Sequence, residues 1–160
     1  MTNLISAEGL KKLEDEYHHL WRVERPKVVQ GVSDAAAEGD RSENAEYIYR
    51  KKELREIDRR LGYLQRRMPN LTVVRSVPDD QSRVFFGALI ELEDARGEAR
   101  RLRIVGGDEA DAGRGEISID APVARALLGR GLDDEVALGG ASAAPERYVI
   151  VDISYPDPER

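Results

Sequence analysis

The first half of the chain has hydrophobic residues at alternating intervals of three and four, the spacing that gathers them on one face of an α-helix. One such segment begins after Ser6, a residue suited to an N-cap, and ends before Gly39. Pro26 lies inside this segment and predicts a kink or a locally loosened turn. We therefore expect a first helix of about 33 residues, or about 50 Å, that is interrupted near its middle.

The second helical segment has a more regular seam. Its seam positions are Leu54, Ile57, Leu61, Leu64, Met68 and Leu71. This repeat is typical of a coiled coil. Because only a very short turn separates the two segments, they predict an antiparallel coiled-coil hairpin over residues 1–76. Trp21 is expected to pack on the seam of this hairpin or against a second domain.

The pattern changes after a polar stretch at 74–82 that contains Pro78. Short runs rich in β-formers follow, and they predict strands at 84–93, 99–105, 116–119 and 148–155. Residues 120–131 predict one short helix, with Asp120 as its cap and Pro122 in its first turn. The fold class expected for the whole chain is therefore α+β, with a small, mostly antiparallel β domain over residues 77–160.

Composition and charge narrow the range of functions. The chain has no cysteine, which excludes disulfides, thiolate metal sites and cysteine nucleophiles. Residues 1–76 hold 15 basic and 13 acidic side chains, whereas residues 77–160 hold 10 and 18. The basic half suits nucleic acid or an acidic protein surface, and the acidic half should avoid phosphate. No apolar run is long enough for a signal peptide or a membrane helix, so we expect a cytoplasmic protein with no membrane partner.

Acidic residues cluster in the turn of the hairpin, in the stretch "GDRSENAEY" at 39–47. One interpretation is structural: Asp40 caps the second helix and Glu43, three residues later, completes a near capping box. The other is chemical: two carboxylates about 5–6 Å apart can share one Mg²⁺ ion. Such a site would be incomplete alone and would need ligands from a second surface, as in half of a two-metal phosphodiester site. The two interpretations are compatible, because each carboxylate has two oxygens.

Basic residues follow the acidic turn. The segment 47–67 contains Arg50, Lys51, Lys52, Arg55, Arg59, Arg60, Arg66 and Arg67. Lys52, Arg55 and Arg59, with Arg66, fall near one stripe, and Tyr47 and Tyr49 lie between this stripe and the acids. A basic stripe beside aromatic rings can hold single-stranded nucleic acid. The alternative is a solvated helix face with intrahelical ion pairs.

These stretches together resemble one family. "GDRSENAEY" with "YRKKELREIDRRLGYL", and then "FFGALIELED", "RRLRIVGGDEAD" and "ISIDAPVARALLG", are similar to the bacterial Gre transcript cleavage factors, closest to the GreB type. The resemblance implies an FKBP-like second domain that docks at the rim of the secondary channel of RNA polymerase. The hairpin would then reach the polymerase active site and stimulate the Mg²⁺-dependent cleavage of backtracked nascent RNA. The resemblance therefore implies a factor that is not an enzyme by itself.

The resemblance also implies roles for individual residues. Asp40 and Glu43 match the metal-assisting tip acids, which share Mg²⁺ with the polymerase active site and bind it only in that complex. The accompanying tip residues are Asn44, Glu46 and Tyr47. The residues that match the RNA-binding patch, which would contact the 3′ end of the extruded RNA, are Arg50, Lys51, Lys52, Arg55 and Arg59. The polymerase-docking positions are Asp120, Ala121 and Pro122, and Ala121 lacks the hydroxyl of the serine that the family often has.

Two other functions stay open on the sequence. A regulator could occupy the same channel without promoting cleavage, and the intact acidic pair at the tip argues against it. A purely structural coiled-coil adaptor would explain the helical rod but not the combination of acidic tip and basic stripe. We expect a monomer, because the hairpin buries its own seam, and a weak contact with DNA is compatible with the basic half.

Overall fold

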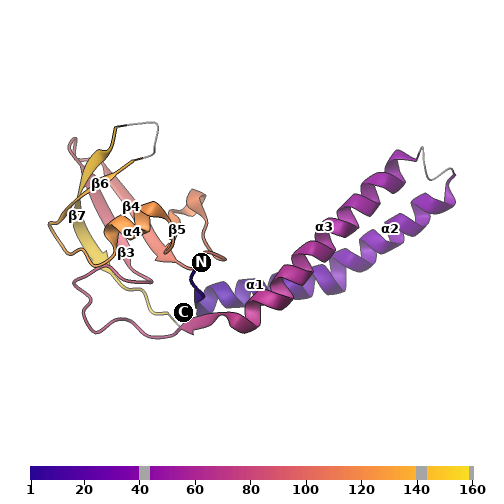
Figure 1. Cartoon of the computed structure of the whole chain (residues 1–160), viewed down its shortest axis with the longest axis horizontal. Helices are drawn as coiled ribbons and strands as arrows, with labels where there is room; N and C mark the ends of the chain where they lie inside the picture. Colours follow the sequence, from indigo (N-terminus) through magenta and orange to yellow (C-terminus); the bar gives the residue numbers. More distant parts are fainter. Residues whose placement is uncertain (40–43, 140–143, 159–160) are drawn as a thin grey trace. The chain divides into compact units, whose positions relative to one another are not determined.

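The computed structural model describes residues 1–39, 44–139 and 144–158, and they form two compact units (Figure 1). The hairpin unit is Lys11–Asn70, and the sheet unit combines Met1–Leu10 with Leu71–Arg160. The sequence predicted a domain boundary between residues 76 and 77, and this boundary stays a prediction. None of the described helices is long and apolar enough to cross a membrane.

The hairpin unit contains the predicted pair of long antiparallel helices. Its first arm runs through α1 (Ala7–His19), a π-helical turn (Leu20–Glu24) and α2 (Arg25–Ala37). Its second arm is α3 (Ala45–Arg67), followed by a 3₁₀ turn (Met68–Asn70). The interruption predicted from Pro26 is confirmed: the π-helical turn precedes it, and the Arg25 N–H bonds to the Leu20 carbonyl. Proline has no N–H for the carbonyl four residues earlier, so the regular pattern is already broken at this point.

The seam of the hairpin is narrow and aliphatic. Val28, Ile57 and Leu61 are buried there, and partly buried side chains pack around them from Tyr17, Leu20 and Leu54. Two ion pairs cross the seam on its flanks. Arg25 binds both oxygens of Asp58, with Nε to Oδ1 at 2.7 Å, and these bonds raise the pKa of the guanidinium. Arg60 binds Glu16 in the same bidentate manner, with N···O distances of 2.6 and 2.9 Å. Because a bidentate ion pair requires one relative geometry of its two side chains, these pairs favour a single register of the two arms.

The base of the first arm begins as predicted, at Ser6. Its hydroxyl oxygen accepts a hydrogen bond from the Gly9 N–H at 3.0 Å, which is the N-cap contact. Two strands that the sequence did not predict lie nearby: β1 (Leu4–Ser6) pairs in parallel with β2 (Thr72–Val74). Each has only three residues, too few to show an alternating pattern.

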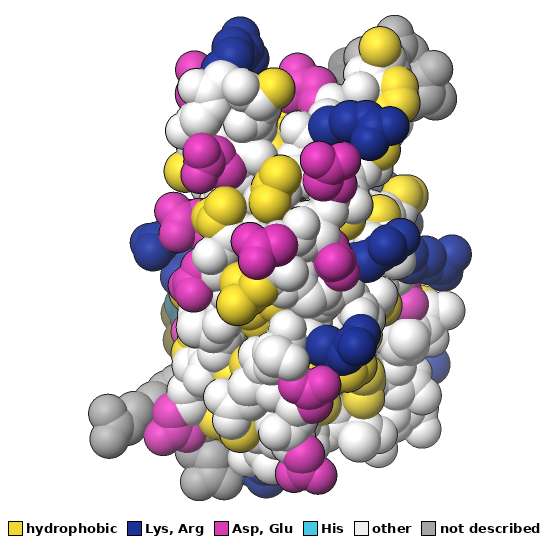
Figure 2. Space-filling model, turned by 90° about the vertical axis from the view of Figure 1, so that its left-hand side faces the viewer, with side chains coloured by type: hydrophobic (Ala, Val, Ile, Leu, Met, Phe, Trp, Pro, Cys, Tyr) yellow, Lys and Arg dark blue, Asp and Glu magenta, His cyan; other side chains and the backbone are white. Residues whose placement is uncertain are grey.

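The sheet unit is built on a five-stranded sheet of order β5-β4-β3-β7-β6. The strands are β3 (Leu89–Asp94), β4 (Ala99–Val105), β5 (Glu116–Ser118), β6 (Glu135–Leu138) and β7 (Glu146–Ser154). Only the β4–β5 pair is parallel, so the prediction of a mostly antiparallel sheet is confirmed. The core beneath it includes Ile90, Leu92, Ile104, Leu127 and Ile150, all fully buried. Acidic, basic and hydrophobic side chains are interspersed over the face seen in Figure 2.

Several predicted boundaries in this unit were wrong. The strand expected at 84–93 begins only at Leu89, because the chain turns at Gly87, whose φ is 85°. The helix expected at 120–131 is shorter, α4 (Pro122–Leu127). Asp120 does not cap it: Ala121 is the N-cap residue, and the Asp120 carboxylate instead accepts hydrogen bonds from the N–H and hydroxyl of Thr2. That acceptor is therefore used to hold the N-terminal segment.

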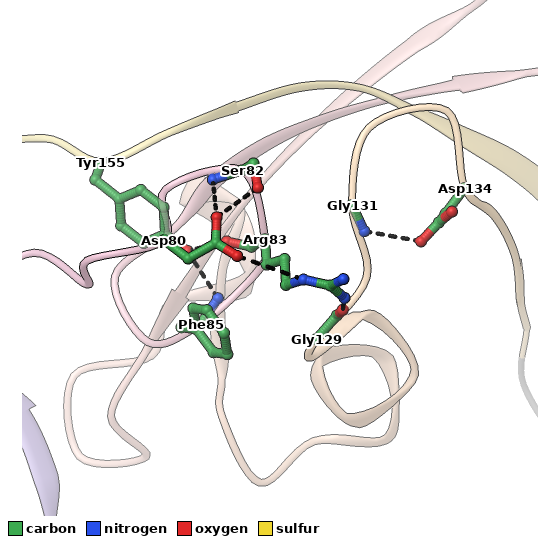
Figure 3. Close-up of polar contacts among 8 residues, drawn as sticks. All are labelled: Asp80, Ser82, Arg83, Phe85, Gly129, Gly131, Asp134 and Tyr155. Atoms are coloured by element: carbon green, nitrogen blue, oxygen red, sulfur yellow. Dashed lines mark hydrogen bonds and ion pairs between the residues drawn. The ribbon is translucent and has the colours of Figure 1, made fainter.

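A polar network holds the loop before β3 (Figure 3). The Tyr155 hydroxyl accepts from the Phe85 N–H at 2.8 Å and donates to the Arg83 carbonyl, and burial raises its pKa. Arg83 also donates to the Gly129 carbonyl at 2.9 Å and pairs with Asp80 at 3.4 Å. The network ties the segment just after β7 to two loops, and it accounts for these side chains structurally.

Candidate functional site

The turn of the hairpin is held by Asn44. The side-chain oxygen of Asn44 accepts from the Tyr47 N–H at 3.1 Å, and its amide nitrogen donates to the Ala35 carbonyl at 2.6 Å. One side chain thus satisfies an N–H at the start of α3 and a carbonyl at the end of α2. The prediction that Asp40 caps the second helix was wrong, since α3 begins at Ala45 and Asn44 is its N-cap. A carboxylate accepts but does not donate, so it could not make both of these bonds.

Replacing Asn44 should therefore destabilise the turn in a graded way. Asn44→Ala loses both hydrogen bonds and should cost about 1–3 kcal/mol of unfolding free energy. Asn44→Asp keeps the cap and loses only the bond to Ala35, so it should cost less. Thermal unfolding of the two variants, followed by circular dichroism, measures this order. Equal stability of Asn44→Ala and the wild type would contradict the role given to this side chain.

Asp40 and Glu43 lie outside the described residues, so their predicted metal-assisting role stays a prediction. Among the residues that the structure describes, no group of three or more His, Cys, Asp or Glu side chains could hold a metal ion. Glu46 accepts from Arg50 at 2.9 Å, one helical turn along α3. Arg50 also donates to Glu53 at 3.2 Å, and the bonds to Glu46 and then Glu53 raise the pKa of the guanidinium. Glu46 is therefore paired with a cation in this state.

Two aromatic rings near the turn form cation–π contacts with basic side chains. The Lys51 ammonium lies 5.7 Å from the centre of the Tyr47 ring, and the Arg50 guanidinium lies 5.6 Å from that of Tyr49. Tyr49 is 57% exposed. Such contacts orient the cations without neutralising them. The turn thus presents rings and positive charge together on the first turns of α3.

The predicted RNA-binding patch divides into two groups. Arg50 and Lys51 have the partners just described. Lys52, Arg55 and Arg59 are exposed, and within the described ranges they form no hydrogen bond or ion pair. Because these three lie opposite the buried seam positions of α3, they keep their full charge for an outside ligand. The sequence did not predict the ion pair between Arg25 and Asp58 across the seam, nor the exposure of Trp21.

The predicted docking residues lie together at the start of α4. Pro122 is its first residue and lines a shallow surface groove with Val123, Leu138 and Tyr148. Ala121 precedes it and makes no side-chain cap. A serine there could cap the helix, so Ala121 leaves an N–H of the first turn for another acceptor. The three positions are therefore adjacent in space, and their contact with a partner stays a prediction.

Comparisons with known proteins cover both units. Residues 3–73 match the family model described as transcription elongation factor, N-terminal, and residues 79–155 match that described as transcription elongation factor, GreA/GreB, C-terminal. Transcription elongation factor GreB of Xanthomonas axonopodis is 56% identical over 155 residues, which cover 96% of this chain and 92% of the relative. The GreB of Pseudomonas aeruginosa is 55% identical, and the match covers 97% of this chain and 92% of the relative. The GreB of Haemophilus influenzae is 53% identical, and the match covers 92% of this chain and 94% of the relative.

Solved structures of related factors are similar at lower identity. The Gfh1 protein of Thermus thermophilus is 19% identical with a TM-score of 0.43, over 96% of this chain and 99% of that one. The GreA/GreB factor of Nitrosomonas europaea is 21% identical with a TM-score of 0.43, over 96% and 100%. Membership rests on the family models and on the sequence relatives. On that basis the chain belongs to the GreA/GreB family of transcription elongation factors.

Proposed function

We propose that this protein is a transcription elongation factor that binds RNA polymerase through its secondary channel and stimulates the polymerase's own cleavage of backtracked nascent RNA. The observation that carries the proposal is the combination of a GreB relative that is 56% identical over 96% of the chain with a hairpin whose turn retains the acidic motif. The protein would release arrested complexes by restoring a 3′ end in the polymerase active site. It would act in the cytoplasm and as a monomer.

The two units would divide the work. The FKBP-like sheet unit would dock on the polymerase through Asp120, Ala121 and Pro122. The hairpin would enter the channel and bring its tip to the catalytic centre. Lys52, Arg55 and Arg59 would bind phosphates of the extruded RNA, because their charges are exposed and unpaired among the described residues. A weak contact with DNA would use the same charges.

Asp40 and Glu43 would hold a Mg²⁺ ion together with groups of the polymerase. The donor set fits this ion, since Mg²⁺ takes one or two carboxylates and leaves its other positions to water and phosphate. When bound, the ion would supply charge stabilisation and an activated water. Asn44 would position the acids by fixing the end of α2 to the start of α3, and Tyr47, whose N–H it accepts, would lie beside them.

The test uses stalled polymerase complexes with labelled, backtracked RNA. Adding the protein with Mg²⁺ should shorten the RNA from its 3′ end and restore elongation, and withholding either the protein or Mg²⁺ should prevent this. The purified protein alone should not cleave RNA, because two carboxylates give too few metal ligands and no substrate cradle. Binding without RNA shortening would favour the non-cleaving regulator. Cleavage by the protein without polymerase would contradict the proposal that it only stimulates another enzyme.

A further inference from the structure

Trp21 is the only tryptophan of the chain, and it is 53% exposed. The prediction that it packs on the seam was wrong, since Trp21 is not among the side chains that pack there, and its packing against the second domain stays a prediction. It lies in the π-helical turn Leu20–Glu24, where the wider turn changes the direction of its side chains relative to a regular helix. A large aromatic ring left in water within such a turn needs an explanation other than packing.

The Trp21 ring is held in place by Arg25. The guanidinium carbon of Arg25 lies 5.6 Å from the centre of the ring. The same guanidinium is bound to both oxygens of Asp58 on α3. Because Arg25 is fixed from the opposite arm, the ring beneath it is oriented before any ligand arrives. The contact also places Trp21 on the flank of the hairpin that carries Asp58.

Unpaired guanidinium groups border this flank. Arg55 lies three residues before Asp58 on α3 and Gly62 four residues after it, so both adjoin Asp58 at the edge of the outer face that carries the basic stripe. Gly62 has no side chain, and Nη1 of Arg66 lies 3.1 Å from the position that a Cβ on Gly62 would occupy. Neither Arg55 nor the guanidinium of Arg66 forms an ion pair with any residue the structure describes. The flank therefore combines an oriented aromatic ring with free positive charge.

We propose that Trp21 is a stacking platform for a base of the extruded single-stranded RNA, with Arg55 and Arg66 contacting the phosphates on either side of it. This inference rests on the proposed function, because it extends the path of the RNA down the hairpin from the tip. Aromatic rings beside a basic groove bind single strands in this way without reading their sequence. An apolar protein surface would use the ring but would leave the unpaired guanidinium groups unexplained.

The position of Trp21 sets the length of RNA that can reach it. From Trp21 to the end of α2 the chain rises by about 24 Å at ~1.5 Å per residue. This distance corresponds to about seven stacked nucleotides at ~3.4 Å each, and to fewer if the strand is extended. Trp21 should therefore matter for long extrusions and not for those of two or three nucleotides.

The experiment compares Trp21→Ala, Trp21→Phe and Val23→Ala in stalled polymerase complexes with short or long extruded RNA. Trp21→Ala should slow cleavage of long extrusions about tenfold at limiting factor and leave short ones unchanged, and Trp21→Phe should restore part of the loss. Val23→Ala is the matched control, since Val23 is 51% exposed in the same π-helical turn, and helical residues two positions apart do not face the same side. Lys52→Ala with Arg55→Ala should show the same dependence on length.

A second measurement separates the inference from the proposed function. RNA carrying 5-iodouridine at successive positions should crosslink to Trp21 from one or two positions several nucleotides from the 3′ end. Crosslinks without any stimulated cleavage of short extrusions would support the stacking site and overturn the proposed function. Equal losses by Trp21→Ala on short and long RNA, with lower polymerase occupancy, would assign Trp21 to a protein contact and overturn the inference. Unchanged cleavage and no crosslink would overturn it as well.

Discussion

Replacing Asp40 with asparagine, or Glu43 with glutamine, should slow stimulated cleavage by about 10²–10³-fold while polymerase binding is retained. Each change is nearly isosteric but removes the negative charge that a hard divalent cation prefers. Charge stabilisation by a metal ion contributes several kcal/mol to such a reaction, so losing about 3–4 kcal/mol of it gives a rate effect of this size. Neither residue caps α3, since Asn44 does, so the start of α3 should stay folded in both variants.

The measurement is single-turnover cleavage of backtracked RNA at equal polymerase occupancy, over a range of Mg²⁺ concentrations. Raising Mg²⁺ should rescue part of the activity of both variants, because the defect is in holding the ion. Glu56→Gln is the matched control, because Glu56 is an exposed carboxylate on α3 outside the acidic motif. If Asp40→Asn and Glu43→Gln cleave as fast as the wild type, the tip acids do not hold the metal and the non-cleaving regulator becomes the better proposal.

The hairpin was predictable because its seam repeats over many turns. Ile57, Leu61 and Leu64 are all buried, as the 3-4 spacing requires, and the interruption before Pro26 follows from its missing N–H. Short elements were not predictable in this way. The three residues of β1 are a strand only because β2, far along the sequence, lies beside them. Their hydrogen bonds depend on tertiary contacts, which local patterns do not contain.

The prediction of Asp40 as the cap of α3 was wrong for a related reason. The D-x-x-E stretch fits the pattern of a capping box, and Asn44 is an equally suitable N-cap residue, so local propensity does not decide between Asp40 and Asn44. The contact that decides between them is the bond from the Asn44 amide to the Ala35 carbonyl, nine residues away and on the other arm. The basic patch shows the same limit. Its residues were identified from their spacing, but which of them keep a free charge depends on Glu46, Glu53 and the neighbouring rings.

Gly106→Ala should be the most destabilising single change of a small residue in the sheet unit. A Cβ added at Gly106 would lie 2.0 Å from the carbonyl oxygen of Leu4 in β1, where no side chain can fit without displacing backbone. We expect a loss of about 2–4 kcal/mol of unfolding free energy, typical of overpacking that must move main chain. For a unit of this size the midpoint of thermal unfolding should fall by roughly 10 °C or more. Differential scanning calorimetry of the full chain measures it.

The matched control is Gly113→Ala, whose added Cβ would have only the Asp111 side chain near it, at 3.4 Å. This variant should melt close to the wild type, and equal melting of the two variants would contradict the expectation. The displacement at Gly106 should also reach the first arm of the hairpin. Glu109 accepts from the Gly106 N–H at 3.1 Å and from the Ser6 N–H at 2.7 Å, and Ser6 caps α1. Hydrogen exchange at the Ser6 and Gly9 amides should therefore speed up in Gly106→Ala and stay slow in Gly113→Ala, because only the first change disturbs the residues that start the helix.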